Sequence, residues 1–222
     1  MRTLYHIWLS PSCRSVRIAL TEKKLQYQLR TENTWERRKE FLAINPAGTV
    51  PVLIEENGDP ISGSSVIFEY LEDKYPDTQL LGIDARERAE TRRLINWFEL
   101  KFDAEVTENL LGEKMMKRFL GLGEPNSQAI RAGCINLQTH LNYISYLTEH
   151  RKWIAGNQLT FADISAAAHL SSLDYIGEIR WEDHIHVKTW YSRIKSRPSF
   201  KPVLLDTIPG ISAPKHYTNL DF

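Results

Sequence analysis

The first segment whose residue types could support chemistry is Ser10-Pro11-Ser12-Cys13, where an apolar segment ends and a helical pattern begins. Proline suits the first turn of a helix, and serine is preferred just before it. An anion or thiolate held at this helix start would be stabilised by free amides and the helix dipole. The sequence therefore allows two interpretations of Ser10, a structural N-cap or a catalytic hydroxyl. Dithiol exchange is excluded, because Cys13 has no second cysteine within the turn.

Two further segments place polar groups where a ligand could contact them. Val50-Pro51 opens a strand, and a cis peptide bond there would turn the Val50 backbone toward the surface, where it can pair with a peptide-like ligand. Ser62-Gly63-Ser64-Ser65 precedes a helix, so its hydroxyls and free amides can bind a carboxylate. Ordinary helix capping explains this second segment equally well.

Another polar pair has a structural meaning. Thr160 and Asp163 have the spacing of a capping box at the start of an apolar helix, and Leu159 can pack on Ile164 across it. We assign this motif to folding. Metal chemistry is not indicated, because the two cysteines, Cys13 and Cys134, are far apart and the seven histidines include no i, i+4 pair.

The elements that would position these residues change character near residue 80. Before it, short strands alternate with helices in the order βαβ, α, ββ, α, which predicts one parallel strand pair and one antiparallel hairpin. The expected strands are 3–9, 25–31, 50–54 and 60–62, and the expected helices are 10–24, 35–44 and 64–75.

After a linker near 76–83, long amphipathic helices are expected over 84–111, 127–150, 160–179 and 184–195. The predicted fold is therefore an α/β domain at 1–80, an all-helical domain at 84–205 and an extended C-terminal tail at 206–222.

Composition excludes several classes of function. The chain has 28 Lys and Arg and 28 Asp and Glu, so its net charge is zero and no global field favours nucleic acid or anionic membranes. It shows neither a signal peptide nor an apolar segment long enough to span a bilayer. We expect a cytoplasmic protein that binds no nucleic acid, no metal and no membrane.

These motifs, in this order, resemble the cytosolic glutathione transferase superfamily over residues 1 to about 200. The resemblance implies a thioredoxin-like domain, a helical domain and a homodimer that binds glutathione. By position, Ser10 matches the hydroxyl that stabilises the glutathione thiolate in serine-type members. Val50 matches the residue whose backbone pairs with the cysteinyl part, Pro51 the cis-proline, and Ser64 the hydroxyl that holds the γ-glutamyl carboxylate.

One position departs from that pattern. The family usually has Glu or Gln before the serine, where this chain has Gly63. Losing one charge-assisted hydrogen bond typically costs about 1.5–3 kcal/mol, roughly a ten- to hundredfold loss of affinity. The sequence therefore predicts weakened glutathione binding.

A narrower resemblance is to the FzlA-type cell division proteins of alphaproteobacteria, transferase-fold homodimers that bind the tubulin-like polymer FtsZ. Three segments carry it, Trp35-Glu36-Arg37-Arg38, residues 190–200 and the tail His216-Tyr217-x-x-Leu220-Asp221-Phe222. Aromatic and arginine side chains are enriched at protein interfaces. Trp35, Leu220, Asp221 and Phe222 are therefore candidate partner-binding residues, although Trp35 could instead be a core contact and the tail a strap on its own domain.

Two functions follow from these resemblances. The leading hypothesis is a dimeric regulator that binds the FtsZ filament and has little or no catalytic activity. The alternative is a glutathione-dependent transferase with a serine-type site, in which Ser10 stabilises the thiolate and a hydrophobic electrophile binds between the domains near the helix that contains Trp97 and Lys101.

Overall fold

A mixed sheet of four strands, in the order β2-β1-β3-β4, forms the centre of the N-terminal part. The computed structural model describes residues 1–208 and 210–220 of the chain. Strand β1 (Arg2–His6) pairs in parallel with β2 (Tyr27–Thr31) and antiparallel with β3 (Val52–Ile54). Strand β4 (Pro60–Ser62) closes the hairpin with β3. The expected parallel pair and hairpin are confirmed.

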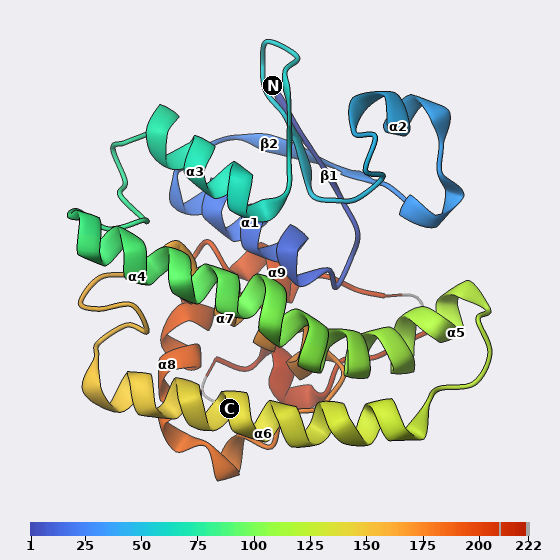
Figure 1. Ribbon diagram of the computed structural model, residues 1–222, viewed down its shortest axis with the longest axis vertical. Helices are drawn as coiled ribbons and strands as arrows, with labels where there is room; N and C mark the ends of the chain where they lie inside the picture. Colours follow the sequence, from blue (N-terminus) through green and yellow to red (C-terminus); the bar gives the residue numbers. More distant parts are fainter. Residues whose placement is uncertain (209, 221–222) are drawn as a thin grey trace.

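Helices α1 (Pro11–Glu22) and α3 (Ser64–Lys74) pack against one another beside this sheet, as Figure 1 shows. The apolar residues of α1 are buried, because the helix contacts α3 on the N-terminal side and α7 (Phe161–Tyr175) and α9 (Lys201–Leu204) of the helical part. This helix is therefore the structural link between the two parts of the molecule.

The segment expected to be one helix over 35–44 is broken. A short 3-10 turn, η1 (Thr34–Glu36), is followed by Arg37 with a φ of +45° and then by α2 (Lys39–Ile44). A left-handed residue cannot continue a right-handed helix, so the chain changes direction at Arg37. The change separates Trp35 from α2 and leaves its side chain 40% exposed.

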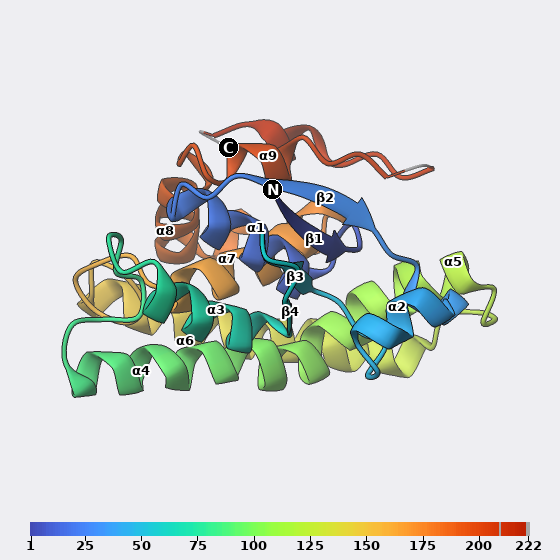
Figure 2. The ribbon, with the colours of Figure 1, turned by 90° about the horizontal axis from the view of Figure 1, so that it is seen from above.

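The long helix expected over 84–111 is longer than predicted. Helix α4 (Ala85–Asn96) continues as η2 (Trp97–Met116), which has π-type hydrogen bonding, and then as α5 (Lys117–Leu120), ending at Gly121. Helix α6 (Ser127–His150) packs along η2, as Figures 1 and 2 show.

The centre of the helical part is α7 (Phe161–Tyr175), every residue of which is buried. Asp163 accepts hydrogen bonds from the backbone N–H and the hydroxyl of Thr160, as expected, and also from Ile154 N–H and Trp190 Nε1. The remaining elements are η3 (Trp181–Asp183), α8 (Ile185–Lys195), α9 (Lys201–Leu204) and η4 (Lys215–Thr218).

The chain after α9 folds back onto its own helical domain. Tyr217 is completely buried beside Tyr175, and the His216 ring lies 2.8 Å from Asp174 Oδ1. Leu220 is 40% exposed, whereas Asp221 and Phe222 lie outside the described residues. The described part of the tail is therefore a strap.

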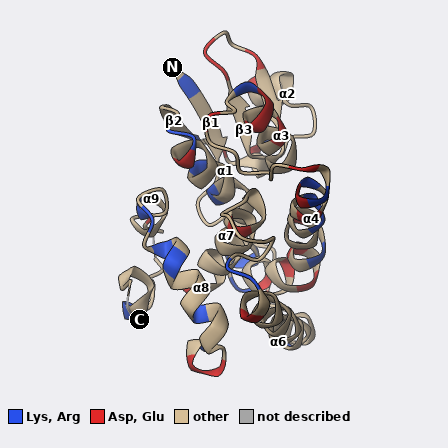
Figure 3. Ribbon diagram, turned by 90° about the vertical axis from the view of Figure 1, so that its left-hand side faces the viewer, with Lys and Arg blue, Asp and Glu red and all other residues tan. Residues whose placement is uncertain are grey.

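Charges of both signs are interspersed on the surface. Figure 3 shows basic and acidic residues mixed along α4, where Arg92 pairs with Glu69 and Arg93 pairs with Glu90. Over residues 1–208 and 210–220, no helix is both long and apolar enough to cross a membrane.

Candidate functional site

A cavity of about 300 Å³ lies between the two domains. Its N-terminal wall comes from the segment after β1, the start of α1 and the turn η1, and its other wall comes from η2 and α5. The lining is mostly apolar and includes Trp8, Leu9, Ser10, Ser12, Trp35, Val50, Asp103, Thr107, Glu108, Leu111, Met115, Met116, Phe119 and Ile208. The structure therefore brings three predicted site residues, Ser10, Val50 and Trp35, to one cavity.

Ser10 is the N-cap of α1 and also lines the cavity. Its hydroxyl accepts a hydrogen bond from Cys13 N–H at 3.3 Å, so the structural interpretation is confirmed in geometry. Ser10 is also one of the residues that line the cavity, so its catalytic interpretation can be tested. Burial raises the pKa of the neighbouring Cys13 thiol to about 11, so this thiol is protonated and unreactive at neutral pH.

The Val50-Pro51 peptide bond is cis. The Pro51 carbonyl accepts the N–H of Gly63 at 3.0 Å, so this turn also positions the start of α3. Gly63 has a φ of +90°, in the region that L side chains rarely adopt, although a Cβ there would meet no atom within 4 Å. Glycine therefore relieves backbone strain at the position where the family resemblance implies Glu or Gln.

Glu99 on η2 is the central polar group of the predicted γ-glutamyl subsite, and sequence reasoning missed it. Its carboxyl oxygens accept hydrogen bonds from Ser64 at 2.6 Å, from Ser12 at 2.7 Å and from Ser165 at 2.6 Å. A serine hydroxyl has one proton to donate, so a ligand carboxylate would have to displace Glu99 to bind it. These serines come from α1, α3 and α7, and nothing in the local sequence indicates that they meet.

The wall of the cavity formed by η2 is acidic. Burial, together with the charges of Glu108 and Glu99, raises the pKa of Asp103 to about 6. Its carboxyl group lies 4.0 Å from Nδ1 of His169 on α7, and burial lowers the pKa of that imidazole to about 4. At neutral pH His169 is therefore uncharged and does not neutralise Asp103.

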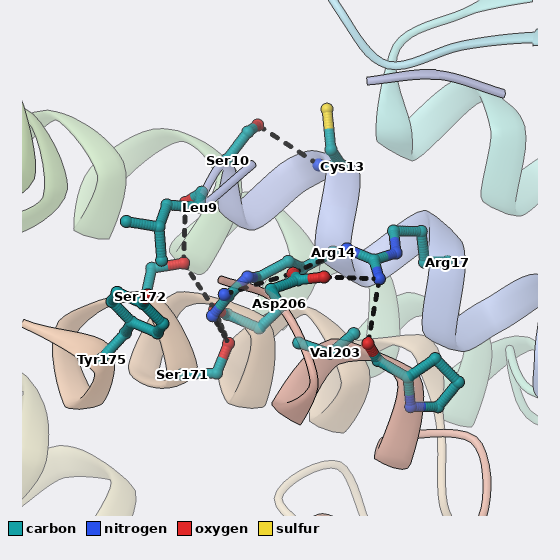
Figure 4. A network of polar contacts seen from close by, with 12 residues as sticks. Leu9, Ser10, Cys13, Arg14, Arg17, Ser171, Ser172, Tyr175, Val203 and Asp206 are labelled. Atoms are coloured by element: carbon teal, nitrogen blue, oxygen red, sulfur yellow. Dashed lines mark hydrogen bonds and ion pairs between the residues drawn. The ribbon is translucent and has the colours of Figure 1, made fainter. Parts of the chain in front are cut away.

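A buried ion network underneath α1 holds the domains together, as Figure 4 shows. Asp206, two residues after the end of α9, accepts hydrogen bonds from Arg17 at 2.7 and 2.9 Å and from Arg14 at 3.3 Å. Arg14 also donates to Ser171 on α7, at 3.0 Å. The positive charges nearest the start of α1 are thus paired inside the protein.

Large apolar side chains are exposed in the cavity lining and in the chain just after α5. Trp35 is 40% exposed and Phe119 on α5 is 55% exposed, and both line the cavity. Leu122, two residues after α5, is 65% exposed. We call Trp35, Phe119 and Leu122 the apolar rim. The sequence analysis identified Trp35 but missed the other two, because an isolated exposed apolar residue has no sequence signature.

The cavity lies against η2, the helix that contains Trp97 and Lys101, at its residues 103–116. Trp97 itself donates to His140 and Lys101 pairs with Glu105, and neither lines the cavity. In the segment 35–38, Arg38 donates two hydrogen bonds to the buried Glu32, so its charge is neutralised within the protein. Leu220 is not among the described residues that line the cavity.

Comparison with known proteins agrees with this architecture. Residues 4–79 match the glutathione S-transferase N-terminal domain, and residues 116–198 match the glutathione S-transferase C-terminal domain. The chain is 46% identical over 224 residues to FtsZ-localized protein A of Caulobacter vibrioides, covering 100% of this chain and 98% of that protein.

Two solved structures are similar along the whole chain. A glutathione S-transferase from Rhodospirillum rubrum superposes with a TM-score of 0.98 at 54% identity, covering 100% of both chains. FzlA from C. crescentus superposes with a TM-score of 0.96 at 46% identity, covering 100% of this chain and 99% of that one. The chain belongs to the glutathione S-transferase family.

Proposed function

We propose that this protein is a dimeric, transferase-fold regulator of cell division that binds the FtsZ filament and has little or no conjugating activity. The observation that carries the proposal is the apolar rim, a group of large side chains exposed on a chain that is similar over its full length to an FtsZ-localized protein. Such a role places the protein in the cytoplasm, with its partner.

The apolar rim has the composition of a binding hot spot. Tryptophan is enriched among residues that dominate binding energy, and it contributes most when neighbouring groups exclude water around it. Phe119, from another element in the same cavity lining, supplies such a neighbour. Because the apolar rim is small, we expect one rim to bind one FtsZ subunit weakly. The same weak contact can be repeated at many subunits along the filament.

A second copy of the chain would make that interaction bivalent. Val66 on α3 is 57% exposed and Leu100 on η2 is 66% exposed, and the Ser64–Glu99 hydrogen bond brings their two helices together. An apolar face of this kind suits a twofold interface, in which the same patch serves both partners. Two rims on one dimer would engage neighbouring subunits with increased avidity.

The dimer can be tested by replacing Leu100 with a charge. Leu100→Glu is expected to convert the dimer to a monomer in analytical ultracentrifugation, whereas Ile185→Glu on the exposed side of α8 is expected to leave the dimer intact. A dimer that persists in Leu100→Glu, or a wild-type chain that sediments as a monomer, contradicts this interface.

The last residues are proposed as a second contact with the filament. The buried side chain of Tyr217 anchors the strap to the helical domain, and Leu220, three residues later, is exposed. Removing Leu220, Asp221 and Phe222 is expected to weaken pelleting with FtsZ filaments without changing thermal stability. Equal pelleting of the truncated and full-length chains would remove the tail from the interface.

The proposed weak catalysis is supported by three features of the glutathione side. Gly63 lacks the polar side chain that would contact the γ-glutamyl group, Ser64 already donates to Glu99, and the cavity wall carries Asp103. Negative charges near a thiolate raise its pKa and so oppose the activation that conjugation requires.

The direct test of this function is co-sedimentation. The purified protein is expected to pellet with FtsZ from its own source when the polymer is assembled with GTP, and to stay in the supernatant when FtsZ is unassembled with GDP. Absence from the pellet under both conditions contradicts the proposal.

The alternative, a glutathione transferase, is favoured by one observation, the position of Ser10 in the cavity lining. In that function Ser10 would stabilise the thiolate of glutathione bound along Val50. Calorimetric titration with glutathione discriminates the two, because a transferase is expected to bind at micromolar concentration, and millimolar or absent binding excludes it.

A further inference from the structure

The interdomain cavity combines an apolar body with a single sign of charge. Among the described residues that line it, Asp103 and Glu108 are acidic, and none is Lys, Arg or His. A cavity of about 300 Å³ holds a small organic molecule. The negative charge of the cavity wall therefore determines which class of small molecule, by charge, the cavity can bind.

Asp103 is a partly buried carboxyl group of the cavity wall. Its side chain is only 34% exposed, and the histidine at 4.0 Å from it is uncharged at neutral pH. Thr107, one turn away, hydrogen-bonds with Asp103 and also with that histidine at 3.0 Å, but it brings no positive charge. A partly buried carboxylate without a cation is destabilised by lost hydration, and a positively charged ligand would restore the missing interaction.

The opposite wall supplies aromatic surface. Trp8 and Trp35 line the cavity from the N-terminal domain, and Met115 and Phe119 line it from the helical side. Aromatic faces and methionine sulfur accommodate apolar groups and also attract ammonium groups. An anion gains nothing from these surfaces and would be repelled by Asp103.

We propose that the interdomain cavity binds a small organic cation, an ammonium group on an apolar or aromatic body, with the charge against Asp103 and the body between Trp8 and Trp35. The cavity would thus discriminate against anionic ligands of the same shape. Trp35 belongs both to this cavity and to the apolar rim, but the inference does not require contact with FtsZ, because it is tested on the isolated protein.

The test compares three probes that share one body and differ in charge. Calorimetric titration at pH 7.5 with 4-phenylbutylamine, 4-phenylbutan-1-ol and 4-phenylbutyrate is expected to show the amine binding about tenfold or more tighter than the alcohol, and the acid binding weakest. Equal binding of amine and alcohol, tightest binding of the acid, or no binding of any probe overturns the proposal.

Two variants assign the preference to its residue. Asp103→Asn is expected to reduce amine affinity to that of the alcohol while alcohol affinity stays unchanged, which also shows that the cavity is still folded. Asp77→Asn, an exposed change in the linker, is expected to keep the wild-type ratio. A preference for the amine that survives in a folded Asp103→Asn protein overturns the role of Asp103; if that variant does not fold, the ranking of the three probes on the wild-type protein decides.

Discussion

The predicted glutathione-site residues and the apolar rim differ in how their side chains are used. At the predicted site, the hydroxyl of Ser64 donates to Glu99 and that of Ser10 caps α1, so both hydroxyls are bonded within the protein. At the rim, Trp35 and Phe119 expose large apolar surfaces. The contrast is between polar groups that are bonded within the protein and apolar side chains of the cavity lining that remain exposed.

The largest expected effect is on the free energy of unfolding, when the buried ion network between the domains is broken. Asp206→Ala leaves Arg14 and Arg17 buried without their carboxylate, and removing one partner of a buried ion pair typically costs about 3–5 kcal/mol. Urea unfolding monitored by circular dichroism measures this loss. Asp77→Ala is the matched control, and equal stability of the two variants would show that the network is not structural.

A second effect concerns pH. Burial lowers the pKa values of His6 and His169 from 6.5 to about 4. Between these two pH values, each histidine binds a proton in the unfolded chain but not in the folded protein. The free energy of unfolding therefore decreases as the pH falls from about 6.5 toward 4. Asp103, whose pKa is raised to about 6, acts in the opposite direction. From these three groups we expect a net loss of about 2–3 kcal/mol between pH 7.5 and pH 5.

This expectation is checked by urea unfolding at both pH values. His169→Gln removes one of the two titrating histidines and is expected to show a smaller decrease than the wild-type protein. A wild-type stability that is constant or higher at pH 5, or an identical decrease in His169→Gln, contradicts the assignment.

The third prediction concerns competition between Glu99 and a ligand carboxylate for the hydroxyl of Ser64. Glu99→Gln removes the negative charge beside Ser64 and weakens the hydrogen bond that occupies its hydroxyl, so glutathione affinity is expected to rise about tenfold. Calorimetry measures the change, with Glu182→Gln on the exposed turn η3 as the control. Unchanged or weaker binding in Glu99→Gln would mean that Glu99 does not compete with the ligand.

The smallest expected effect concerns Ser10. Ser10→Ala removes the N-cap of α1 and is expected to cost about 1 kcal/mol of stability, measured by urea unfolding, with no change in whatever weak conjugating activity the protein has. Loss of measurable turnover in a stable Ser10→Ala protein would instead favour the transferase alternative.

Local patterns predicted most of the fold but only part of the site. The order of strands and helices, and the bonds between Thr160 and Asp163, depend on residues close in sequence. Glu99 and Asp206 acquire their roles from groups brought together by tertiary packing, so no local spacing identifies them. The break at Arg37 was missed for a related reason, because a left-handed arginine is not indicated by its residue type.

The measurement that tests the central claim most directly compares Trp35→Ala with Glu99→Gln in FtsZ co-sedimentation. Removing a hot-spot tryptophan typically costs about 2 kcal/mol, so Trp35→Ala is expected to weaken FtsZ binding about 30-fold, whereas Glu99→Gln is expected to pellet like the wild-type protein. Both variants are first checked for wild-type thermal stability. Pelleting of Trp35→Ala at the wild-type level would contradict the assignment of filament binding to the apolar rim.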